Sequence, residues 1–71
     1  MSIKEEYQII KGRVTAEDIL KNAKEKGLKK PRGAEYSIHI VRAILSGRGE
    51  DKDIGKIVTE FRKKLEDLEL V

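Results

Sequence analysis

Two glycine-containing loops hold the side chains of this chain that are best suited to bind phosphate. The first loop, "KKPRG" at residues 29–33, lies immediately before a predicted helix, and the second, "SGRG" at residues 46–49, follows that helix. Lysine and arginine donate charge-assisted hydrogen bonds to phosphate oxygens, and the backbone N–H groups at a helix N-terminus also attract anions. The predicted nucleic-acid-binding residues are Lys26, Lys29, Lys30, Arg32 and Arg48.

The net charge of the chain is modest, but its basic residues are concentrated in one stretch. Residues 21–32 hold six lysines and arginines against one acid, Glu25, so they carry a local charge of +5 in a chain of net charge +3. This concentration favours an anionic partner such as duplex nucleic acid, bound through its phosphates. A second interpretation stays open, because lysines at the end of a helix also stabilise the helix dipole without any ligand.

Few other residues are suited to chemistry. His39 is the single histidine, Glu35 lies about one helical turn before it, and a histidine on the polar stripe of a helix is typically a surface residue. Cysteine is absent, which excludes disulfides and thiolate metal sites. The chain contains no phosphate-binding loop of the GxxxxGK[ST] type. We therefore expect neither an enzyme nor a bound metal or cofactor.

A second candidate surface is an apolar seam near the C-terminus. Its residues are spaced four, three, four and three apart, which is the heptad spacing of helices that pair along one face. Lys64 and Glu69 flank the seam at the positions where coiled coils form ion pairs between chains. Packing inside a helical bundle produces the same spacing, so that interpretation stays open as well. The predicted interface residues are Ile54, Val58, Phe61, Leu65 and Leu68.

The elements that must position these residues are helices. Ser2 and Glu5 form a capping-box pattern before the first segment. Thr15 is suited to cap the second segment, and Asp51 or Asp53 is suited to cap the fourth. The predicted helices span residues 3–11, 16–26, 34–46 and 54–70.

One alternative concerns the N-terminal segment, because "YQIIKGRV" at residues 7–14 is also compatible with a strand. Helix is favoured there, since Ile3, Tyr7 and Ile10 share one helical face and Gly12 follows them. The predicted fold class is all-α, a small bundle of three to four helices in a single domain over residues 1–71. An N-terminal strand followed by helices is the alternative.

The length of the chain limits its stability as a monomer. A domain of 71 residues buries only about 60% of its unfolded surface, so regular helices or self-association must compensate. We therefore expect a homo-oligomer. Charged residues make up 41% of the chain, a composition typical of proteins from heat-loving organisms. No apolar run has the length of a signal peptide or membrane span, so we expect a cytoplasmic protein that does not bind membranes.

Together these features favour a small nucleic-acid-binding or regulatory protein that contacts phosphates through the basic loop and acts as a dimer. The alternative is a helical module for protein–protein interaction or oligomerisation with no role in nucleic-acid binding. The two hypotheses overlap, because a dimer can also bind DNA.

Overall fold

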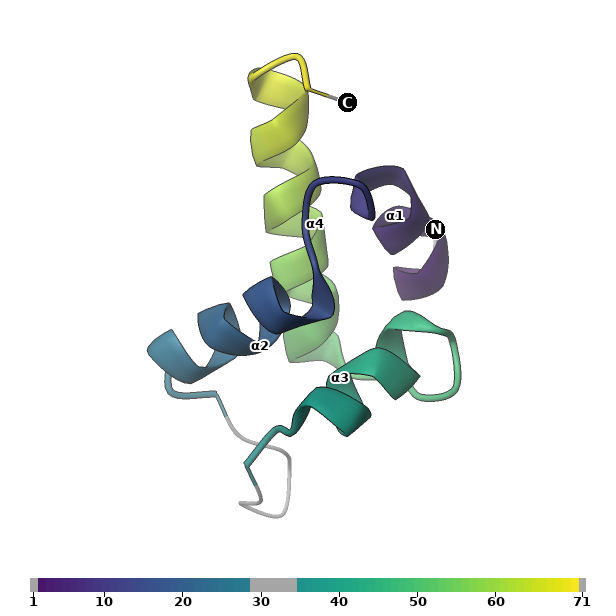
Figure 1. Ribbon diagram of the computed structural model, residues 1–71, viewed down its shortest axis with the longest axis vertical. Helices are drawn as coiled ribbons and strands as arrows, with labels where there is room; N and C mark the ends of the chain where they lie inside the picture. Colours follow the sequence, from purple (N-terminus) through teal and green to yellow (C-terminus); the bar gives the residue numbers. More distant parts are fainter. Residues whose placement is uncertain (1, 29–34, 71) are drawn as a thin grey trace.

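The computed structural model describes residues 2–28 and 35–70, and these residues form four helices (Figure 1). The helices are α1 (Ile3–Ile10), α2 (Ala16–Glu25), α3 (Ile38–Leu45) and α4 (Lys52–Asp67). The described part of the chain contains no strand, which confirms the predicted all-α class. The alternative strand over residues 7–14 is wrong, because Tyr7 to Ile10 complete α1 and the residues after them turn towards α2.

The first two helices begin where the sequence predicts. The Ser2 hydroxyl accepts a hydrogen bond from the Glu5 backbone N–H at 3.2 Å, and the Glu5 side chain accepts one from the Ser2 backbone. Thr15 caps α2 in the same way, with the backbone N–H of Asp18 as donor at 3.2 Å. Both caps satisfy backbone N–H groups that a helix leaves without partners. The two helices end at Ile10 and Glu25, one residue before each predicted end.

The third helix begins later than predicted, at Ile38 rather than at residue 34. Ser37 is its N-cap, and the Ser37 hydroxyl accepts a hydrogen bond from the Ile40 backbone N–H at 3.3 Å. Tyr36 precedes the helix, yet its side chain is buried in the core and its hydroxyl donates to Asp51 Oδ2 at 2.5 Å. Tyr36 therefore fills the core from the segment before α3 and not from the helix itself.

The fourth helix begins earlier and ends earlier than predicted, at Lys52 and Asp67 instead of residues 54 and 70. Asp51, one of the two predicted caps, accepts hydrogen bonds from the backbone N–H groups of Asp53 and Ile54 at 2.9 and 3.1 Å. The helix stops because Glu69 adopts a left-handed conformation with a φ of 58°. This turn directs the chain away from the helix axis before the predicted end.

The core lies where the four helices meet, and it also takes residues from the segments between them. α1 runs along the first half of α4, with Ile3 close to Gly55 and with the Thr59 hydroxyl donating to Glu6 at 2.6 Å. Figure 1 shows the last turns of α4 extending beyond the other three helices. No described helix has both the length and the apolar character needed to cross a membrane. The buried apolar residues are Ile10, Val14, Ile19, Ala23, Tyr36, Val41, Ile44, Leu45, Ile54, Ile57 and Val58.

Helices α2 and α3 lie side by side and run in opposite directions. Glu17 in the first turn of α2 approaches Arg42 near the end of α3, with 3.7 Å between the charged groups. At the other end, Leu28 after α2 and Tyr36 before α3 line the same small hollow. The two ends of the loop that carries "KKPRG" are therefore held close together at the start of α3.

Candidate functional site

Three of the five predicted nucleic-acid-binding residues, Lys29, Lys30 and Arg32, lie outside the described residues. Lys26 is described, and it is the C-cap of α2. The Lys26 ammonium group lies 2.5 Å from Glu60 Oε2 on α4. This partly exposed ion pair offsets part of the charge of Lys26 and joins α2 to α4. Lys26 is therefore less suited to phosphate than its sequence neighbourhood suggests.

The structure does not bring Lys26 and Arg48 together. Lys26 ends α2 near the start of α3, whereas Arg48 follows the other end of α3. The eight residues of α3 separate these two positions by about 12 Å of helix. Of the predicted residues that the structure describes, Lys26 and Arg48 thus lie near opposite ends of α3.

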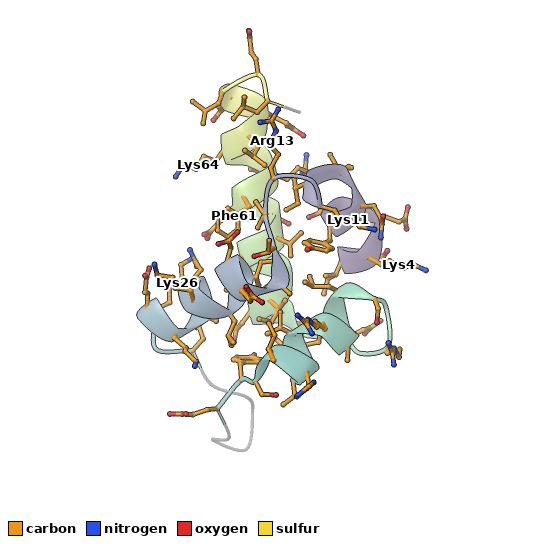
Figure 2. The ribbon with its side chains drawn as sticks, in the orientation of Figure 1. Lys4, Lys11, Arg13, Lys26, Phe61 and Lys64 are labelled. Carbon is orange, nitrogen blue, oxygen red and sulfur yellow. The ribbon has the colours of Figure 1, made fainter. Side chains whose placement is uncertain are left out.

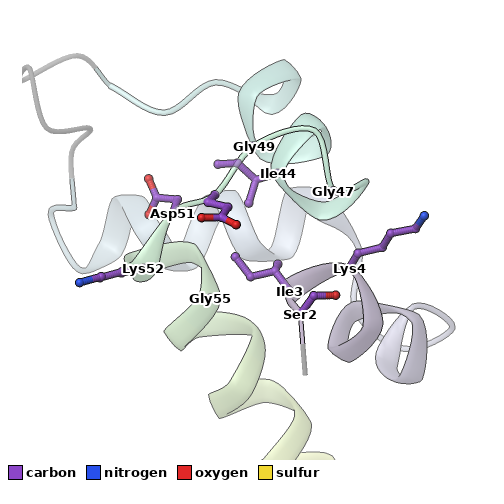
Figure 3. Close-up of a pocket in the computed structure, with 10 residues that line it drawn as sticks. Ser2, Ile3, Lys4, Ile44, Gly47, Gly49, Asp51, Lys52 and Gly55 are labelled. Atoms are coloured by element: carbon purple, nitrogen blue, oxygen red, sulfur yellow. The ribbon is translucent and has the colours of Figure 1, made fainter.

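Arg48 lies in a group of basic side chains that the sequence analysis missed. Its Nε donates to the Ser46 hydroxyl at 3.1 Å, in the turn between α3 and α4. The stem of Lys4, from α1, crosses the same turn, because a Cβ atom at Gly47 would lie 3.2 Å from Lys4 Cδ. Figure 3 shows the Lys4 side chain passing Gly47 with its amine directed away from the bundle. Two residues distant in sequence thus present positive charge at one turn.

Lys11 and Arg42 extend this group around the end of α3. They line one hollow of about 410 Å³ between α1, α2 and α3. Ser46 and one acidic residue, Glu17, line the same hollow. Figure 2 shows Lys4 and Lys11 on the same side of the molecule, and Lys26 on the opposite side. All four members of the group are exposed, and we call them the basic surface. The basic surface comprises Lys4, Lys11, Arg42 and Arg48.

The charges of the basic surface are only partly balanced. Among the described residues, Glu17 is the only acid paired with it, at 3.7 Å from Arg42 with both side chains largely exposed. Such a pair is worth little in water. Lys4, Lys11 and Arg48 form no ion pair with any described residue. The sequence signal was weak: Lys4 on α1 and Lys11, the C-cap of α1, are seven residues apart, a spacing that places them on one side of the helix.

A hollow of about 500 Å³ lies beside the basic surface, where the starts of α1 and α4 meet the α3–α4 turn (Figure 3). Asp51 lines this hollow, but its carboxylate is occupied by Tyr36 and by two backbone N–H groups. Burial raises the pKa of the Tyr36 phenol, and the hydrogen bond to Asp51 raises that pKa further. This pair holds the start of α4 against the segment before α3, which is a structural task.

The remaining candidates for chemistry have ordinary positions. His39 is exposed on α3, as the polar stripe predicts. The Tyr7 hydroxyl donates to the Val14 carbonyl at 3.0 Å, and burial and the charge of Asp18 raise the pKa of Tyr7. No group of three or more potential metal-ligating side chains occurs within residues 2–28 and 35–70.

The predicted seam on α4 is divided by the fold. Ile54 and Val58 are completely buried in the chain's own core, so they are not available to a second chain. Phe61 and Leu65 are partly buried against that core, and Leu68 is 59% exposed. An interface with a second chain therefore stays a prediction for Phe61, Leu65 and Leu68.

Comparison with known proteins finds no family that matches this chain, and no similar curated protein or solved structure. The proposals below rest on the arrangement of the chain's own residues.

Proposed function

We propose that this protein binds duplex nucleic acid through phosphate contacts made by the basic surface. The observation that supports this most is the gathering of four exposed cations from α1, α3 and the α3–α4 turn around Ser46 and Gly47. Long, exposed lysine and arginine side chains suit the regularly spaced phosphates of a duplex. The predicted basic loop at residues 29–33, which precedes α3 in the sequence, would add further lysine and arginine side chains for phosphate.

The aromatic residues favour a duplex over single strands. Binding to single strands relies on exposed aromatic faces on which the bases stack. Tyr36 is buried, and Tyr7 and Phe61 are partly buried against the core. Affinity should therefore come from charge and fall steeply with salt.

The test is fluorescence anisotropy of a labelled duplex at about 50 and 200 mM salt. Four phosphate contacts predict that affinity falls about a hundredfold between these concentrations. The double variant Lys4→Gln/Lys11→Gln removes two charges and keeps much of each side-chain stem. It should reduce the slope of log affinity against log salt by about 2.

The matched control is Lys56→Gln/Lys63→Gln, which removes two charges from exposed lysines of α4. It should leave the slope nearly unchanged. Equal losses in both double variants would mean that only net charge matters, and would reject the basic surface as the site.

The predicted loop is tested separately. Replacing Lys29, Lys30 and Arg32 together by alanine should weaken binding further if the loop touches a second phosphate group. Unchanged DNA and RNA binding in this triple variant would remove the loop from the interface while leaving the basic surface in place.

A second candidate function is a helical interaction module that docks another protein helix on the end of α4. The observation that favours it is the 59% exposure of Leu68, the residue that follows the projecting last turns of α4 (Figure 1). An exposed apolar stripe on a projecting helix is a common docking surface for a partner helix. The substitution Phe61→Asp should abolish such docking, and a complex that survives it would reject this function.

A further inference from the structure

The apolar stripe of α4 changes from buried to exposed along its length. Ile54, Ile57 and Val58 are at most 1% exposed. Further along the same face, Phe61 and Leu65 are partly buried and Leu68 is largely exposed. The apolar stripe is therefore continuous along α4, and its last residues are exposed to solvent at the projecting end of the helix.

The reason is the difference in length between α4 and its neighbour. α4 has 16 residues and α1 has 8. Glu6, in the middle of α1, lies beside Thr59 and Arg62. α1 ends about one turn further on, so the last turns of α4 extend past it (Figure 1).

The turn after α4 enlarges the exposed apolar area. The Leu70 backbone N–H donates to the Leu65 carbonyl at 2.9 Å, so the chain folds back on the last helical turn. This capping turn commonly brings the two flanking apolar side chains together. Leu70 is 41% exposed. We call this area the outer seam, and it comprises Phe61, Leu65, Leu68 and Leu70.

The charges around the outer seam suit a second copy of the same chain. Residues 61–70 hold three basic residues and three acids, so their charges sum to zero and two copies do not repel each other. Lys64 and Glu69 are exposed and form no ion pair with any described residue. Lys64 in the last turn of α4 and Glu69 in the capping turn after it therefore place opposite charges at the same end of the seam.

We infer that a second copy of this chain docks on the outer seam, with the two α4 ends parallel and Lys64 of each copy facing Glu69 of the other. This inference rests on the second candidate function and is independent of the basic surface. An interface of four apolar residues is at the small end of specific interfaces, below about 1,200 Å² in total. The dimer should therefore be weak and should form only at high protein concentration.

Sedimentation equilibrium between about 20 µM and 1 mM tests the dimer. The wild-type mass should rise from one towards two protomers over this range. Leu68→Asp should keep the protein monomeric at the highest concentration, and circular dichroism should confirm that it folds. A wild-type chain that stays monomeric at 1 mM would overturn the inference, whereas nucleic-acid binding by the basic surface would be unaffected.

A charge exchange tests the orientation without touching the apolar residues. Lys64→Glu and Glu69→Lys should each weaken association at least tenfold, because each places like charges opposite each other. An equal mixture of the two variants should dimerise again, since each then supplies the charge that the other lacks. The control Lys63→Glu makes the same charge change at the preceding residue, whose side chain points in a different direction from the helix axis. It should weaken association less than Lys64→Glu does. If the mixture does not associate, the proposed pairing is wrong.

Discussion

The inner half of α4, residues 52–59, and its outer half, residues 60–67, share one apolar stripe but have different surroundings. In the inner half, Ile54 and Val58 are completely buried, and Ile3 of α1 lies against Gly55. In the outer half, Phe61 and Leu65 are only partly buried, and the stripe ends just beyond it at the largely exposed Leu68. The comparison shows that helical spacing determines which residues share a face, whereas the lengths of neighbouring helices determine how much of that face is covered.

The largest expected difference between the halves is in the free energy of unfolding. Ile54→Ala should lower it by about 3 kcal/mol, because it leaves a cavity in a fully buried position. Leu68→Ala should lower it by less than about 0.5 kcal/mol, since most of the side chain is already in water. Urea denaturation of both variants at low protein concentration measures the difference. Similar losses would mean that the outer half is also part of the monomer's core.

The contact that fixes the start of the inner half should have the next largest effect. Tyr36→Phe removes the hydrogen bond to Asp51 and should cost about 1.5 kcal/mol. The pKa of Tyr36 is raised in the folded protein, mainly by burial and then by Asp51. Its stabilisation is therefore complete below the usual tyrosine pKa of about 10 and is lost as the pH rises above that value.

Denaturation between about pH 7 and 11 checks this prediction. The wild type should lose stability above about pH 10 more steeply than Tyr36→Phe does. Part of the loss should persist in the variant, because the pKa of Tyr7 is raised too. Parallel curves for the two proteins would show that Tyr36 does not contribute to the pH dependence.

The turns that end the helices offer a smaller, two-way test. Gly47 ends α3 with a φ of 89°, whereas Glu69 has a φ of 58° after α4. Glycine adopts such conformations without the steric cost of other residues. Glu69→Gly should therefore stabilise the monomer by about 0.5 kcal/mol, and Gly47→Ala should destabilise it by about 1 kcal/mol. Thermal denaturation at low protein concentration measures whether each variant is more or less stable than the wild type. A loss of stability in Glu69→Gly would contradict the account of this turn.

The smallest effect is expected at the boundary between the halves, where Lys26 of α2 pairs with Glu60. Their side chains are 39% and 62% exposed. Lys26→Gln should cost only about 0.3 kcal/mol, because water screens exposed ion pairs. It should also leave DNA binding nearly unchanged. A marked loss of binding would show that Lys26 belongs to the nucleic-acid-binding site, as the sequence predicted.

The start of each of the first two helices could be predicted because its signal is local. Ser2 and Thr15 cap helices through contacts within three residues, and such patterns are visible in a sequence. The start of α3 was predicted wrongly, because Tyr36 reaches the core through a contact with Asp51, fifteen residues away. No short window contains that pairing.

The candidate site was harder to predict for the same reason. Arg48 was predicted from its loop, but Lys4 and Lys11 join Arg48 and Arg42 only through the packing of α1 against α3. Conversely, the local concentration of charge around Lys26 could not reveal that Lys26 pairs with Glu60, thirty-four residues away. Basic residues that are close together in the sequence are therefore not the same residues that lie close together on the folded surface.

The most direct test of the central claim is an NMR titration of the ¹⁵N-labelled protein with a short duplex at low salt. The account predicts that amide shifts concentrate at Lys4, Lys11 and residues 42–48, and that they disappear as salt is raised. The outer seam should change little, since it is proposed to bind protein and not phosphate. Shifts confined to α4, or no shifts at millimolar duplex, would contradict nucleic-acid binding by the basic surface.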